Sequence, residues 1–108
     1  MRAELVRGGG FAGLRFTAAV DGDALSLDER RALEELIAEA GFWSLPAVIP
    51  PVAPPGADRY RYQITIDGDG RRHAVTAPES AIPEKLRPLV EWLEARGHFA
   101  PCAPGKKP

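Results

Sequence analysis

The strict alternation of polar and apolar residues over 59–66, RYRYQITI, constrains the fold of this chain more than any other feature. A period of two places successive side chains on opposite faces of a β-strand, and aromatic and β-branched residues favour strands. The Asp67–Gly70 segment, DGDG, is typical of a tight turn, because glycine adopts positive φ without steric cost. Residues 71–76 therefore return as the partner strand of a hairpin.

A second hairpin is predicted at the start of the chain. Residues 3–7 form a short, partly alternating segment, and residues 14–20 place Leu14, Phe16, Ala18 and Val20 on one face. The glycine-rich segment 8–13 lies between them, and such a segment is typical of a hairpin loop.

Two further segments have helical spacing. Ser26 and Glu29 form a capping box, so the first helix is predicted to begin near Leu27, and Gly41 is placed to end it. The second helix precedes Gly97, and both carry apolar stripes at the i, i+3, i+4 and i+7 positions. The stripe residues are Leu33, Leu36, Ile37 and Ala40 in the first helix and Leu86, Leu89, Val90 and Leu93 in the second.

The order ββαββα predicts an α+β fold with one four-stranded antiparallel sheet and two helices packed on one face. The other face of the sheet is expected to be exposed to water, which agrees with the polar side chains at every second position of residues 59–66. A chain of 108 residues has room for a single core. We expect one domain over residues 1–99 and a disordered tail over residues 100–108, where there is nothing to bury.

Five prolines fall between Phe42 and Asp58, and they exclude a helix or an interior strand there. The segment is predicted to be a long extended loop. Phe42, Trp43 and Leu45 at its start are expected to pack under the first helix. The sequence leaves open the role of residues 46–55 and that of Cys102.

Charge and composition argue against several functions. A formal net charge of −1 gives no electrostatic reason to expect a partner that is a nucleic acid or an anionic membrane. No apolar run approaches the roughly 20 residues that cross a bilayer, and the start of the chain has no signal-peptide core. A cytoplasmic location is therefore expected, with export by a non-classical route left open.

Catalysis finds little support in the sequence. There is no nucleophile elbow, no phosphate-binding glycine loop and no paired histidine or cysteine motif. His73 and His98 are far apart in sequence, and the single cysteine excludes an internal disulfide or a multi-cysteine metal site. We predict that the protein is not an enzyme and needs no cofactor.

The glycine-rich tip is the best candidate for a binding element. Phe11 is flanked by residues too small to cover its ring. Either the ring folds back onto the edge of the sheet, or it projects from the tip as a binding hot spot.

Four segments together resemble emfourin, a family of bacterial protein inhibitors of protealysin-like enzymes, which are zinc metallopeptidases of the thermolysin family. The segments are Arg7–Gly13, Phe42–Pro46, Asp58–Tyr62 and Ile82–Leu89. The resemblance extends from Met1 to about Arg96. It implies a non-catalytic inhibitor that fills the cleft of a protease with two neighbouring loops. One loop gives a carboxylate to the zinc of the enzyme, and the other gives apolar side chains to its substrate pockets.

On this resemblance the partner is a thermolysin-like, protealysin-like zinc metalloprotease, and the free inhibitor is expected to be a monomer. Asp58 is favoured as the zinc ligand over Asp67 and Asp69, because the first hairpin tip and the start of the third strand can share one end of the sheet. The alternative for Asp58 is local backbone bonding at the end of the proline-rich loop. The predicted protease-binding residues are Gly10, Phe11, Ala12, Gly13, Leu14, Asp58 and Tyr60. The alternative function is a non-catalytic interaction module with a different protein partner.

Overall fold

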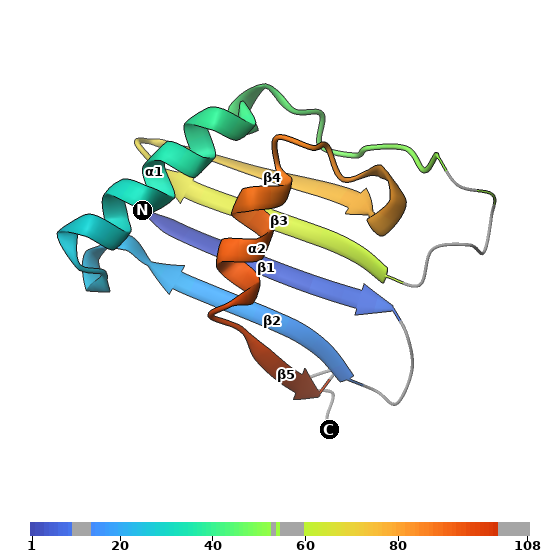
Figure 1. Ribbon diagram of the computed structural model, residues 1–108, viewed down its shortest axis with the longest axis horizontal. Helices are drawn as coiled ribbons and strands as arrows, with labels where there is room; N and C mark the ends of the chain where they lie inside the picture. The colour runs from blue at the N-terminus through green and yellow to red at the C-terminus, as the bar shows by residue number, and fades with distance from the viewer. Residues whose placement is uncertain (10–13, 53, 55–59, 102–108) are drawn as a thin grey trace.

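The computed structural model describes residues 1–9, 14–52, 54 and 60–101, and these form an antiparallel sheet with two helices on one face (Figure 1). The strands are β1 (Arg2–Gly9), β2 (Leu14–Asp21), β3 (Tyr60–Gly68), β4 (Arg71–Pro78) and β5 (His98–Pro101), in the spatial order β4-β3-β1-β2-β5. The helices are α1 (Leu27–Ala40) and α2 (Arg87–Glu94). Three short 3-10 turns cover Gly22–Ala24, Phe42–Ser44 and Glu79–Ala81.

The α+β class, the antiparallel pairing and the two helices are confirmed, but the prediction of four strands is wrong. A fifth strand, β5, follows α2 and pairs with β2, so the element order is ββαββαβ. The strand includes Ala100 and Pro101, so the predicted disordered tail over residues 100–108 begins too early. Its physical basis is the exposed edge of β2, whose unpaired backbone groups bind the chain as it leaves α2.

The core lies between the sheet and the helices. Each of the four long strands buries at least two of the residues that point toward the helices, in the alternating pattern of a half-buried strand. Leu5, Ile64 and Val75 are fully buried on the sheet side, and Leu33 and Leu89 are fully buried on the helix side.

The predicted ends of α1 are confirmed. Ser26 and Glu29 form both hydrogen bonds of the capping box, and Gly41 ends the helix in the left-handed conformation at φ 60°. Phe42 then turns into the core, where it is fully buried beneath α1. The local sequence therefore fixes both where α1 stops and where the chain goes next.

Part of the proline-rich segment runs along the outer edge of β4. The Ile49 amide donates to the Thr76 carbonyl at 2.8 Å, and the Thr76 amide donates to the Ala47 carbonyl at 2.8 Å. This parallel bridge satisfies backbone groups at that edge of the sheet. Over its described residues, 42–52 and 54, the segment has no interior strand, which agrees with the prolines there.

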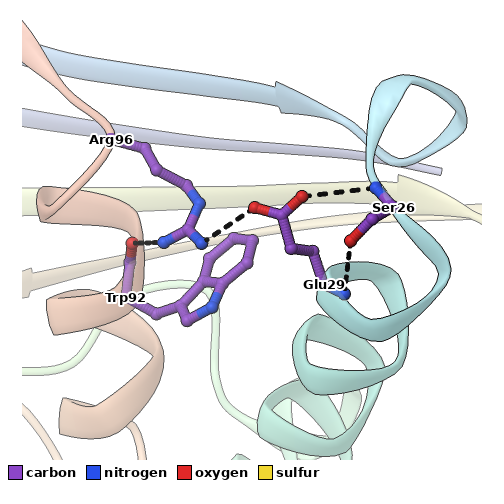
Figure 2. A network of polar contacts seen from close by, with 4 residues as sticks. All are labelled: Ser26, Glu29, Trp92 and Arg96. Atoms are coloured by element: carbon purple, nitrogen blue, oxygen red, sulfur yellow. Dashed lines mark hydrogen bonds and ion pairs between the residues drawn. The ribbon is translucent and has the colours of Figure 1, made fainter.

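A polar network joins the start of α1 to the end of α2 (Figure 2). The Arg96 guanidinium lies 3.3 Å from the Glu29 carboxylate, donates to the Trp92 carbonyl at 3.0 Å and stacks over the Trp92 ring at 3.6 Å. Glu29 also accepts the Ser26 amide at 3.3 Å. The network fixes the C-terminal end of α2 immediately before β5.

This network predicts an acid-sensitive contribution to stability. The backbone and side-chain hydrogen bonds of Ser26, followed by the contact with Arg96, hold the pKa of Glu29 below its ordinary value of 4.5. A lowered carboxyl pKa stabilises the fold above that ordinary value, and the stabilisation is lost as the pH falls through the folded-state pKa. The Tm difference between the parent and Glu29→Gln should therefore shrink from pH 7 to pH 3. A difference that stays constant over this range would show that the carboxylate charge is not involved.

Candidate binding site at one end of the sheet

The strand register brings the two predicted binding loops to the same end of the sheet. Gly9, the last residue of β1, pairs with Tyr60, the first residue of β3. Residues 10–13 follow Gly9 directly, and residues 55–59 directly precede Tyr60. The two segments are therefore anchored on adjacent strands, and neither helix extends over this end of the sheet (Figure 1).

The turn between β3 and β4 lies at the opposite end. Asp67 pairs with Arg2, and Arg2 lies seven residues from Gly9 along β1. At about 3.3 Å per residue, this separation is roughly 23 Å. Asp67 and Asp69 are therefore remote from the anchors of the two loops, and the residues around Asp69 form a tight turn with positive φ at Asp69 and Gly70.

Arg7 organises the sheet surface beside the loop anchors. Its guanidinium lies 4.7 Å from the centre of the Phe16 ring, 4.9 Å from that of Tyr60 and 6.0 Å from that of Phe99. It also makes a half-buried ion pair with Glu94 of α2 at 3.1 Å. We call Arg7, Phe16, Tyr60 and Phe99 the Arg7 cluster. Cation–π contacts of this kind orient rings as well as stabilise them.

The cluster joins four strands where the loops begin, and the Arg7–Glu94 ion pair connects it to α2. Arg7 comes from β1, Phe16 from β2, Tyr60 from β3 and Phe99 from β5. The neighbouring Tyr62 is buried, and that burial raises the pKa of its phenol despite a hydrogen bond from Arg7. The anchors of both loops are therefore held by one set of packed side chains.

The structure describes only part of the predicted binding site. Gly10, Phe11, Ala12, Gly13 and Asp58 lie outside the described residues, and of Leu14 only the backbone position, at the start of β2, is given. Tyr60 is half-buried in the Arg7 cluster. Whether these residues contact a protease stays a prediction.

Sequence reasoning missed Arg7 and Phe99. Arg7 shares the alternation of Ala3 and Leu5, so its position on the helix side of β1 was readable in principle. No signal in the sequence pointed to Phe99, because a four-residue strand that ends in a proline is too short to show a period.

The two histidines lie in different surroundings. His73 donates from Nε2 to the Leu45 carbonyl at 2.7 Å and packs edge-on against Phe42, with ring centres 5.5 Å apart. His98 is exposed in β5. Over the described part of the chain, no three histidine, cysteine or acidic side chains gather in a group able to hold a metal ion.

Comparison with known proteins gives one match. A model of the protein family described as Emfourin matches residues 5–94. No curated protein and no solved structure matches the chain. Among the described residues, no helix has the length and apolar character needed to span a membrane.

Proposed function

The chain belongs to the Emfourin family of metallopeptidase inhibitors, and from this we propose that it inhibits a thermolysin-like zinc metallopeptidase of the protealysin type. In this proposal residues 10–14 and Asp58 enter the substrate cleft of the enzyme together. The pairing of Gly9 with Tyr60 is the observation that carries the proposal, because it anchors both segments side by side.

Asp58 is the proposed ligand of the zinc ion of the target enzyme. A catalytic zinc ion keeps one coordination position for water or substrate, and a carboxylate oxygen occupies such a position at about 2.0–2.2 Å. Asp58 is two residues before Tyr60, so a short span separates it from the anchored strand. When the carboxylate displaces the zinc-bound water, hydrolysis has no nucleophile.

The apolar element provides affinity. Phe11 lies in the segment between Gly9 and Leu14, whose two ends belong to the paired strands β1 and β2. Burial of one large apolar side chain in a substrate pocket contributes roughly 1.5–3 kcal/mol. The ligand to zinc is a side chain, so no peptide bond of the inhibitor has to occupy the cleavage position.

Titration of the purified protein against a protealysin-like peptidase and against thermolysin, with a peptide substrate, tests this proposal. We expect stoichiometric or near-stoichiometric loss of cleavage at micromolar inhibitor, with the inhibitor recovered intact. Unchanged cleavage of the substrate by both enzymes at these concentrations would overturn the proposal.

Replacement of Phe11 by alanine tests whether its ring contributes to binding. Phe11→Ala should weaken inhibition by about tenfold, equivalent to about 1.4 kcal/mol, because the ring no longer fills an apolar pocket. Leu27→Ala is the matched control, since Leu27 is an exposed apolar residue at the start of α1. Both variants should keep the Tm of the parent. Equal inhibition by the parent and Phe11→Ala would place the aromatic contact elsewhere.

A further inference from the structure

We propose that Phe99 of β5 is a third point of contact with the target peptidase, packing against an apolar surface at the rim of the substrate cleft. The inference rests on the proposed function and adds a binding element to the two loops. It follows from the exposure of Phe99, its position and the way its ring is held.

Phe99 is exposed to an unusual degree for its size and surroundings. Its side chain is 62% exposed, although its neighbour Phe16 is half-buried. Among the residues whose exposure the structure describes, the other large apolar ones with comparable exposure are the aliphatic Leu27, Val48 and Val52. Aromatic side chains contribute much of the binding energy at protein interfaces, so an exposed ring is a candidate anchor.

The position of Phe99 is next to the anchors of the loops. Phe99 pairs with Phe16 across the β2·β5 ladder, so both rings lie on the same face of the sheet. Phe16 shares the alternation of Ala18 and Val20, which are buried on the helix side. Phe16 is two residues from Leu14, which places the β5 ring about 7 Å along the strand from the start of β2.

The ring is also held in a fixed orientation. It meets the Phe16 ring edge-on, at 5.3 Å between ring centres and 81° between planes, and the Arg7 guanidinium lies over both rings. Gly97 packs so closely on Phe16 that a Cβ there would lie 2.4 Å from the Phe16 ring and 2.8 Å from the Thr17 carbonyl oxygen. A pre-oriented aromatic loses little side-chain entropy on binding, which favours its use as an anchor.

Phe99 lies outside the part of the chain that matches the family model. The Emfourin match ends at residue 94, whereas β5 covers His98–Pro101. The strand lies beside β2 at the edge of the sheet, where Pro101 pairs with Leu14, the first residue of β2 (Figure 1).

Inhibition of a protealysin-like peptidase by the parent, Phe99→Ala and Leu27→Ala tests this inference. We expect Phe99→Ala to raise the inhibition constant by about tenfold, chiefly through faster dissociation, while Leu27→Ala matches the parent. If the parent inhibits and Phe99→Ala inhibits equally well, Phe99 is not a contact, although the proposed function stands. If the parent itself does not inhibit, the proposed function fails first.

Photo-crosslinking separates direct contact from a supporting role in the fold. A p-benzoylphenylalanine side chain placed at position 99 should form an adduct with the peptidase, and the same probe at position 27 should not. An adduct between two copies of the inhibitor, or no adduct from position 99 in an inhibited mixture, would overturn the inference. This readout remains decisive even if Phe99→Ala lowers the Tm.

Discussion

Asp58→Ala is expected to weaken inhibition of the target peptidase by about a hundredfold, equivalent to about 2.8 kcal/mol. The variant removes the carboxylate that we propose as the ligand of the catalytic zinc ion, so water can return to the open coordination position. Asp58→Asn should lose a similar amount, because a neutral amide is a weaker ligand for zinc than a carboxylate. Progress curves with a peptide substrate give the inhibition constant for each variant.

Asp67→Ala is the matched control for this prediction. Asp67 is an exposed aspartate of β3 that pairs with Arg2, at the end of the sheet opposite the Gly9–Tyr60 pair. Its removal should leave inhibition unchanged. The zinc-ligand assignment is wrong if Asp58→Ala inhibits like the parent, or if Asp67→Ala is the variant that loses inhibition.

Phe42→Ala is expected to lower the free energy of unfolding by about 3–5 kcal/mol. Phe42 is fully buried, and its ring contacts those of Trp43 and His73 edge-on at 5.9 and 5.5 Å between centres. Truncation leaves a cavity between α1 and the sheet, and it removes the ring that supports His73 beside the Leu45 carbonyl. Urea unfolding followed by circular dichroism measures the loss.

Val52→Ala serves as the stability control, because the Val52 side chain is 77% exposed. Its effect should stay within about 0.5 kcal/mol of the parent. A loss below about 1 kcal/mol for Phe42→Ala would show that the region under α1 collapses around the smaller side chain, contrary to the tight packing described above.

Most of the fold was predictable, because its main elements carry local signals. The alternation of residues 59–66 fixed the buried face of β3, and the capping box of Ser26 and Glu29 fixed the start of α1. Gly41 supplied the left-handed residue that ends the same helix. Each of these signals depends on neighbours within a few residues, so no knowledge of the tertiary structure was needed.

The fifth strand was not predictable for the opposite reason. The β5 strand is short and includes Pro101, and it is stabilised by pairing with β2, about 80 residues away in the sequence. Such pairing depends on an exposed sheet edge that exists only after the rest of the sheet has formed. The bridge of Val48 to Thr76 is a second case, since a single parallel bridge leaves no periodicity in the sequence.

For the candidate site, the sequence predicted that two loops share one end of the sheet, and the register of β1 with β3 pairs Gly9 with Tyr60, the residues that flank them. The Arg7 cluster depends on four strands meeting, so only the structure could show it. The roles of Phe11 and Asp58 stay predictions.

Amide hydrogen exchange of the chain, alone and bound to a protealysin-like peptidase, tests most directly which end of the molecule binds. We expect new protection on binding at residues 10–14 and 56–60, with no change in the turn around Asp69. Protection at that turn and at the start of α1, with unchanged exchange in both loops, would show that the opposite end of the sheet binds the peptidase.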